Sequence, residues 1–231
     1  MTDLVPVEAL GRARDFMRRA KVEFDQCNLI VDRVWAPITA RLERYPGRNL
    51  RPEHVHSFLR EWQAMPGYFR LHIGVTRPKP ARAEIFEIRL SPTTLWNDDW
   101  PNEDGEMNLA IVNTIVALGR DGQRYATPIA YVASHIVSRH ALARRYQRGS
   151  EWDDAAVLRD ISALMQVQPD KALDGQPCDI PTQGGEWRGA HLVMADRARP
   201  APIVALRTWL ANDQLIRRAD RFSASHAECR H

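Results

Sequence analysis

The sequence has little cysteine, and none of it is paired at short spacing. Its three cysteines, Cys27, Cys178 and Cys229, lie far apart. An odd number of widely separated cysteines argues against a disulfide framework and against the paired spacing of a zinc site. We therefore predict three free thiols in a reducing compartment.

Long apolar runs are also missing. The longest run, 109–118, is interrupted by Asn113 and Thr114, and it is much shorter than the roughly 20 residues that cross a bilayer as a helix. The amino terminus, MTDLVPVE, has neither the basic start nor the apolar segment of a secretory signal. These absences predict a cytoplasmic protein without a membrane partner.

Several sequence motifs of common enzyme classes do not occur. The chain contains neither a Walker-type phosphate loop nor a Gly-x-Gly-x-x-Gly turn, and it has no Gly-x-Ser-x-Gly elbow. Nucleotide-dependent enzymes and serine hydrolases are therefore disfavoured, and we expect no cofactor.

The basic residues are mostly arginine. Few of the 32 basic residues are lysines, and the formal net charge is only +3. Because arginine richness partly reflects a GC-rich genome, the overall balance is weak evidence for a nucleic-acid partner, and local clustering of charge is more informative.

Apolar periodicity predicts an α+β fold for the 231 residues. Apolar side chains recur every three or four positions in the amino-terminal third, whereas the period becomes two beyond Tyr68. We expect amino-terminal helices packed with an antiparallel sheet, followed by a basic helix and carboxy-terminal strands. The predicted helices are 7–45 (one or two), 53–65, 134–149 and about 153–166, and the predicted strands are 68–75, 84–90, 109–119, 125–132, 186–194 and 202–210.

The same pattern suggests a division of the chain into a helical region at 1–67, an α+β domain at 68–218 and a polar tail at 219–231. Two local signals refine it. The Asp-Gly dipeptide in 120–123 is typical of a hairpin turn. Gly149 stands where a left-handed carboxy-terminal helix cap is expected. Residues 169–185 are predicted to form a loop.

The segment 134–149 carries the most informative pattern. Positions four apart on a helix differ by about 40° around the axis, so His140, Arg144 and Arg148 form one stripe. Imidazole can move a proton near neutral pH, and guanidinium can hold a phosphate. The combination suits phosphodiester chemistry on a nucleic acid.

A structural interpretation of His140 is equally open. Ile136, Val137 and Ala143 neighbour it on the helical wheel, so the imidazole could be half-buried and hydrogen-bonded, with solvated arginines. His135 precedes it by five residues, which on a helix separates the two rings by about 140°. Shared metal coordination is therefore not expected.

The segment 96–106 is acidic and aromatic. Asp98, Asp99, Asp104 and Glu106 offer oxygen ligands to a divalent cation. Their spacing does not match a calcium-binding loop, so we predict solvated carboxylates and no metal site. Alternatively, Trp96 to Trp100 could dock a basic protein partner.

The motif Ser138-x-His140-Ala141, followed by Arg144 and then Arg148-Gly149, resembles one found in small proteins of the barnase–EndoU–colicin–RelE-like fold, which include toxin ribonucleases. In that fold a late strand often ends in a threonine and an aromatic residue, and Thr208-Trp209 is similar. The resemblance covers roughly the last 80 to 95 residues.

The resemblance implies a metal-independent endoribonuclease. RNA cleavage without a metal needs a proton acceptor, a proton donor and cationic groups around the phosphorus. We predict His140, Arg144 and Thr208 as catalytic residues, with His140 as acid or base. The predicted substrate-binding residues are Arg148, Arg207, Tyr146 and Trp209. The rings of Tyr146 and Trp209 could stack on a base.

The alternative is a non-catalytic regulatory module in which the same helix binds RNA, another nucleic acid or a protein partner resembling an antitoxin. Such a binder would depend on the arginines and not on proton transfer at His140. Convergence of His140, Arg144 and Thr208 in space would favour the nuclease.

Overall fold

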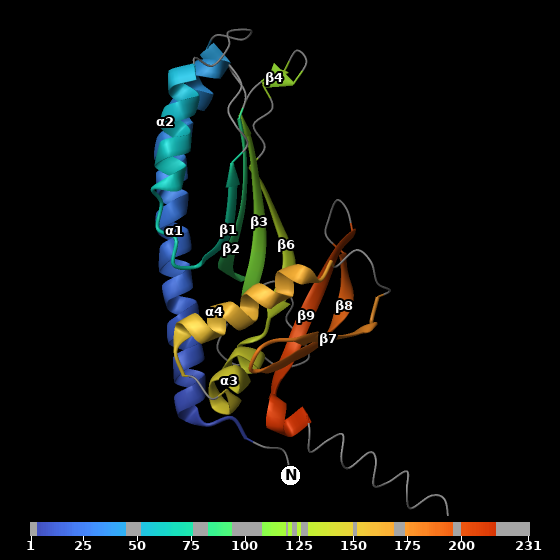
Figure 1. Ribbon diagram of the computed structural model, residues 1–231. Coiled ribbons are helices and arrows are strands. Elements are labelled where there is room, and N and C mark those ends of the chain that lie inside the picture. The colour runs from blue at the N-terminus through green and yellow to red at the C-terminus, as the bar shows by residue number, and fades with distance from the viewer. Residues whose placement is uncertain are drawn as a thin grey trace, which may run out of the picture. The chain divides into compact units, whose positions relative to one another are not determined.

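The computed structural model describes residues 4–44, 52–75, 83–93, 108–118, 120–121, 124–125, 129–149, 152–168, 174–195 and 200–215. It confirms an α+β fold with amino-terminal helices and a mostly antiparallel sheet (Figure 1). Seven strands are hydrogen-bonded in the order β1-β2-β3-β6-β9-β8-β7, and β4 and β5 form a separate hairpin. The elements are α1 (Val7–Arg44), α2 (Pro52–Gln63), β1 (Arg70–Val75), β2 (Ala83–Thr93), β3 (Asn108–Leu118), β4 (Arg120–Asp121), β5 (Arg124–Tyr125), β6 (Ile129–Val137), α3 (Arg139–Arg148), α4 (Asp154–Ser162), the 3-10 helix η1 (Ala163–Gln166), β7 (Pro177–Pro181), β8 (Gly185–Ala195) and β9 (Pro200–Ala211).

The chain forms two compact units, each built from separated segments. Unit 1 contains Met1–Met17, Thr93–Ala110 and Ser134–His231, and unit 2 contains Arg18–Pro92 and Ile111–Ala133. The division into 1–67, 68–218 and 219–231 remains a prediction from the sequence.

Helix α1 follows the apolar periodicity of its sequence and is one continuous helix. Its buried residues recur every three or four positions, which places them on one face. In unit 1, the Phe16 ring contacts the Tyr146 ring edge to face, with 6.5 Å between centroids. Among the α1 side chains that the structure describes, the buried ones are Ala9, Ala13, Phe16, Met17, Ala20, Glu23 and Cys27.

In unit 2, strands β1 and β2 pair antiparallel. The β4–β5 hairpin pairs Arg120 with Tyr125 and Asp121 with Arg124, as the Asp-Gly signal predicts. The turn residues 122–123 lie outside the described residues.

In unit 1, two sequence predictions are wrong. Residues 134–137 are not helical but form the end of β6, where His135 pairs in parallel with Val204 of β9. The β-branched Ile136 and Val137 favour the strand. The predicted loop 169–185 also contains a strand, β7, which pairs with β8 and buries only alternate residues.

Helix α3 packs against β9, and α4 is hydrogen-bonded to Trp187 of β8 on the same face of these two strands. Trp187 and Trp209 are register partners on this face, and both are fully buried. The Trp187 indole N–H donates to the carbonyl of Asp160 on α4 at 2.9 Å. A bulge shifts the register between Arg188 and Gly189, so side chains beyond it change face relative to their residue numbers.

Gly149 is not a left-handed cap. Its φ of −71° and ψ of 143° are extended, values that any residue can adopt. The position instead needs glycine because the Arg145 side chain passes over it. A Cβ at Gly149 would lie 1.7 Å from Arg145 Nη1 and 2.8 Å from the Arg145 carbonyl oxygen.

We therefore expect Gly149→Ala to destabilise unit 1 by roughly 2 kcal/mol, the usual size of an overpacking cost. Gly11→Ala on α1 is the matched control, since no atom lies within 4 Å of a Cβ there. Helix propensity predicts that this control stabilises by roughly 0.5–1 kcal/mol. Urea unfolding of both variants measures the two changes, and equal effects would contradict the interpretation.

Two remaining predictions concern cysteine and membranes. Cys27 and Cys178 are free, buried thiols, and Cys229 lies outside the described residues. In the part of the chain that the structure describes, no helix has the length and hydropathy of a membrane span.

Candidate functional site

Helix α3 presents the predicted site residues. Ser138 caps it, with its Oγ accepting from the Ala141 N–H at 3.0 Å. One turn on, Arg144 Nε donates to His140 Nε2 at 3.3 Å, and Arg144 Nη1 donates to Gln147 Oε1 at 2.7 Å. The predicted juxtaposition of His140 and Arg144 is therefore present, and it includes Gln147, which the sequence analysis did not single out.

The electrostatics at His140 are those of a crowded cationic site. Its side chain is half-buried, and burial is the largest cause that lowers its pKa. Arg144, Arg148 and Arg139 lower the pKa further by charge repulsion. The imidazole is therefore kept neutral, and the positive potential around it favours an incoming anion.

The next arginine on α3 points into the protein. Arg145 Nε forms a buried ion pair with Asp160 Oδ2 of α4, and both side chains are about 95% enclosed. Its guanidinium also lies over the Trp209 ring, 4.9 Å from the centroid. Arg145 therefore joins α3, α4 and β9, and its charge is compensated inside unit 1.

Tyr146 and Trp209, the predicted base-stacking residues, are fully buried. The Tyr146 hydroxyl donates to Asp154 Oδ1 at 2.6 Å, and the Trp209 ring lies under Arg145. In this conformation neither ring has a face open to a base. Arg148 Nη1 donates to the Trp209 carbonyl at 2.9 Å, which ties that arginine to β9.

The structure does not bring Thr208 to His140 and Arg144. Thr208 is the register partner of Arg188 and directly precedes Trp209. Because successive strand residues point to opposite faces, its side chain points away from the face that α3 covers. Arg207 is exposed at the bulge in β9.

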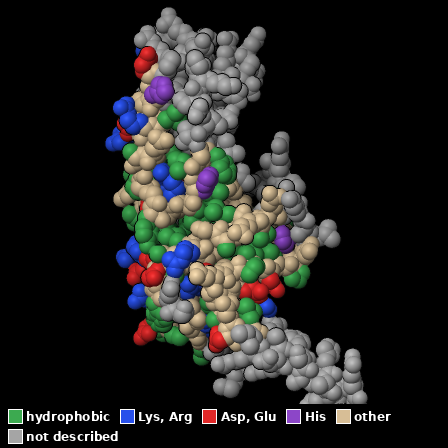
Figure 2. Space-filling model, in the orientation of Figure 1, with side chains coloured by type: hydrophobic (Ala, Val, Ile, Leu, Met, Phe, Trp, Pro, Cys, Tyr) green, Lys and Arg blue, Asp and Glu red, His purple; other side chains and the backbone are tan. Residues whose placement is uncertain are grey.

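Figure 2 shows arginine and lysine side chains in separate groups with acidic side chains between them, not in one broad basic patch, on the face in view. The predicted acidic segment 96–106 lies outside the described residues. Among the residues that are described, no cluster of three or more histidine, cysteine, aspartate or glutamate side chains could hold a metal ion.

Comparison with known proteins gives no relative for the chain. No protein-family model matches it, and the searches of curated proteins and of solved structures found no significant match.

Proposed function

We propose that the protein is a non-catalytic RNA-binding module that uses α3, on which Arg139, His140, Gln147 and Arg148 are partly exposed and Arg144 is 7% exposed. The observation that carries this proposal is the half-buried His140, which accepts a hydrogen bond from Arg144. Burial lowers its pKa most, and Arg144, Arg148 and Arg139 lower it further. Three guanidiniums around one neutral ring make a local positive potential. A phosphate group is the common cellular anion that suits guanidinium best, because both can form paired hydrogen bonds.

Binding accounts for the geometry better than cleavage does. A general base needs a free lone pair within reach of the proton it takes, whereas His140 Nε2 accepts a hydrogen bond from Arg144. Thr208 belongs to the other face of β9, and the two aromatic rings are enclosed. An endoribonuclease using His140, Arg144 and Thr208 remains the alternative hypothesis. For either function, the free thiols of Cys27 and Cys178 are compatible with action in the cytoplasm.

Fluorescence anisotropy with a labelled single-stranded RNA tests the proposal. We expect binding that weakens as salt rises, through release of counterions. Arg144→Gln should weaken binding roughly tenfold and reduce its salt dependence. The matched control is Arg159→Gln on α4, which removes an exposed charge in the same unit and should change the Kd little.

Two further readouts discriminate the hypotheses. A bound phosphate stabilises the imidazolium form, so RNA should raise the pKa of His140, and affinity should increase as pH falls. Recovery of intact RNA from the complex supports a binder. Cleavage products that disappear in His140→Gln, with binding retained, would favour the ribonuclease. Absence of binding at low salt would contradict both and leave a protein partner as the remaining interpretation.

A further inference from the structure

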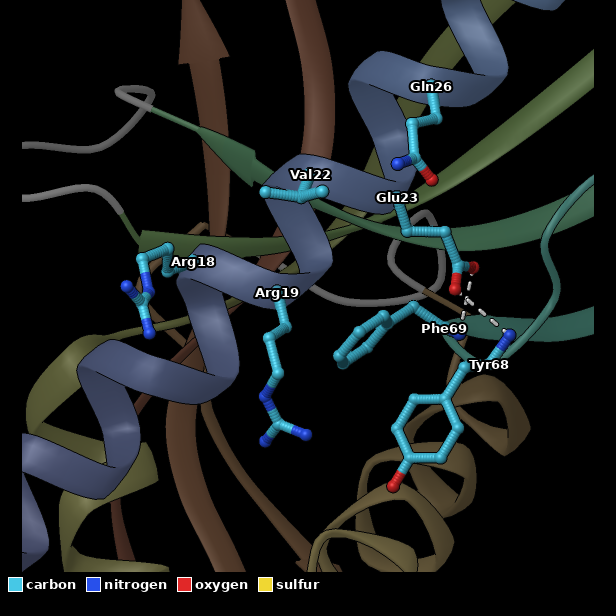
Figure 3. Close-up of a pocket in the computed structure, with 7 residues that line it drawn as sticks. All are labelled: Arg18, Arg19, Val22, Glu23, Gln26, Tyr68 and Phe69. Carbon is cyan, nitrogen blue, oxygen red and sulfur yellow. Dashed lines mark hydrogen bonds between the residues drawn. The ribbon is translucent and has the colours of Figure 1, made fainter.

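Unit 2 contains a cavity of about 410 Å³ on the surface of α1. Residues of α1 form one wall, and Tyr68 and Phe69, just before β1, form the other (Figure 3). The volume is within the roughly 300–1,000 Å³ range of small-molecule sites. The lining residues are Arg18, Arg19, Val22, Glu23, Gln26, Tyr68 and Phe69.

The Tyr68 ring is exposed and packs against the buried ring of Phe69. Its side chain is 52% exposed, whereas Phe69 is only 3% exposed. The two rings meet edge to face, with centroids 5.0 Å apart and an interplanar angle of 77°. A large aromatic ring that is both exposed and fixed is suited to stacking on a planar ligand, because little side-chain freedom is lost on binding.

The backbone at Tyr68 and Phe69 is held by the buried carboxylate of Glu23. Glu23 Oε2 accepts the Tyr68 N–H at 3.1 Å, and Glu23 Oε1 accepts the Phe69 N–H at 3.0 Å, as the dashed lines in Figure 3 show. The same Oε1 accepts from Arg89 Nη1 at 3.2 Å. Both Glu23 oxygens are therefore occupied, and the Arg89 guanidinium partly offsets the charge of the carboxylate.

The ion pairs behind Glu23 compensate the charge further. Glu87 Oε1 lies 2.7 Å from Arg89 Nε and 2.5 Å from Arg70 Nε, and Arg89 Nη1 also donates to the Pro66 carbonyl at 2.7 Å. With these acids paired internally, the exposed charged side chains that line the cavity are Arg18 and Arg19. The cavity is therefore lined by two arginine side chains beside an aromatic surface.

We propose that this cavity binds a nucleoside phosphate, either as a free nucleotide or as one residue of a single-stranded nucleic acid. The base stacks on Tyr68, and Arg19, which reaches from α1 toward the Tyr68 ring in Figure 3, holds the phosphate. The Gln26 amide on the same wall can both donate to and accept from a base edge. This site goes beyond the proposed function and does not depend on α3, which belongs to unit 1.

An acidic peptide is the competing ligand class, since a carboxylate also pairs with arginine. The observations favour a nucleotide, because the exposed and rigid feature of the cavity is a flat ring and not a deep apolar slot. A planar base would cover the exposed part of Tyr68 while leaving its phosphate at Arg19.

Calorimetric titrations with adenosine monophosphate and with a short single-stranded oligoadenylate test the proposal on the full-length protein. We expect Tyr68→Ala to weaken binding at least tenfold, and Tyr68→Phe to retain it, because the stacking ring remains. Arg19→Gln should weaken binding and reduce its salt dependence. Lys21→Gln is the charge-matched control, since Lys21 is on α1, pairs with Asp25 and does not line the cavity.

The outcomes separate the sources of the ligand. Equal affinity for both probes supports a free nucleotide, and binding of the oligoadenylate alone supports a nucleic acid if Tyr68→Ala weakens that binding. Binding of neither probe, or identical binding by Tyr68→Ala with its fold intact by circular dichroism, overturns the proposal. Tighter binding of a glutamate-rich peptide than of either probe also overturns it. Because α3 is also expected to bind single-stranded RNA, only the binding that Tyr68→Ala weakens counts for this site, so failure here is distinguishable from failure of the α3 proposal.

Discussion

Asp160→Asn should destabilise unit 1 by about 3 kcal/mol or more, because it leaves the Arg145 guanidinium enclosed without its counter-ion. Both side chains are about 95% enclosed in the wild type. Arg145 also contacts Trp209, and the Asp160 carbonyl accepts from Trp187. Chemical denaturation followed by tryptophan fluorescence measures the loss, since these two indoles report on the same core.

The double variant Arg145→Met, Asp160→Leu provides the sharper test. Removing both charges avoids the unpaired guanidinium, so the double variant should be more stable than Asp160→Asn. Asp25→Asn is the surface control: its partner Lys21 is about half exposed, and such pairs contribute roughly 0–1 kcal/mol. If Asp160→Asn cost no more than this control, the buried pair would not be a main support of unit 1.

Acidification from pH 6.5 to pH 4 should remove roughly 3 kcal/mol of stability through His135 alone. This side chain is only 2% exposed. Burial is the largest cause that lowers the pKa of His135 from 6.5 to about 4; the Val167 backbone acts in the opposite direction, and His191 lowers it further. His191 and His135 are register partners of the same residue, Val204, on either side of it.

The sign follows from the lowered pKa. Between pH 6.5 and 4 the unfolded chain binds a proton at His135 and the folded protein does not. The free energy of unfolding therefore decreases as the pH decreases through this window, and the contribution of His135 is constant above it. His135→Gln should therefore show a smaller difference between pH 7.5 and pH 4.5 than the wild type in thermal or urea unfolding. His56→Gln, at an exposed position of α2, is the control, and equal slopes for His135→Gln and wild type would refute the assignment.

The fold was largely predictable because local periodicity determines most of its elements. The buried positions of α1 recur at helical spacing, and the Asp153 side chain caps α4 by accepting from the Ala156 N–H, as its place before an apolar run suggests. Residues 134–137 could not be assigned in this way. Their strand state depends on pairing with β9, some 70 residues later in the chain, and the only local signal for it is the weak strand preference of Ile136 and Val137.

The candidate site was predictable only in part for a similar reason. Helical spacing correctly places Arg144 one turn after His140. It cannot show that Arg144 and Arg145 are both buried, because burial depends on other elements: the partner of Arg145 is on α4 and its aromatic neighbour is on β9. Thr208 was assigned by resemblance, whereas its orientation follows from strand alternation next to a buried tryptophan. The cavity in unit 2 is lined by residues of α1 and by Tyr68 and Phe69. These two segments lie too far apart in the sequence for a short motif to predict the cavity.

Strand β7 has a consequence for how molecules of this protein meet one another. It is the last strand of the sheet, and Pro177 and Pro181 stand at its two ends with the exposed Asp179 between them. Proline has no N–H to donate to a neighbouring strand, and the charge of Asp179 disfavours pairing with another strand. A strand from a second molecule would therefore find few donors and a carboxylate at this edge, which protects the protein from edge-to-edge polymerisation through β7.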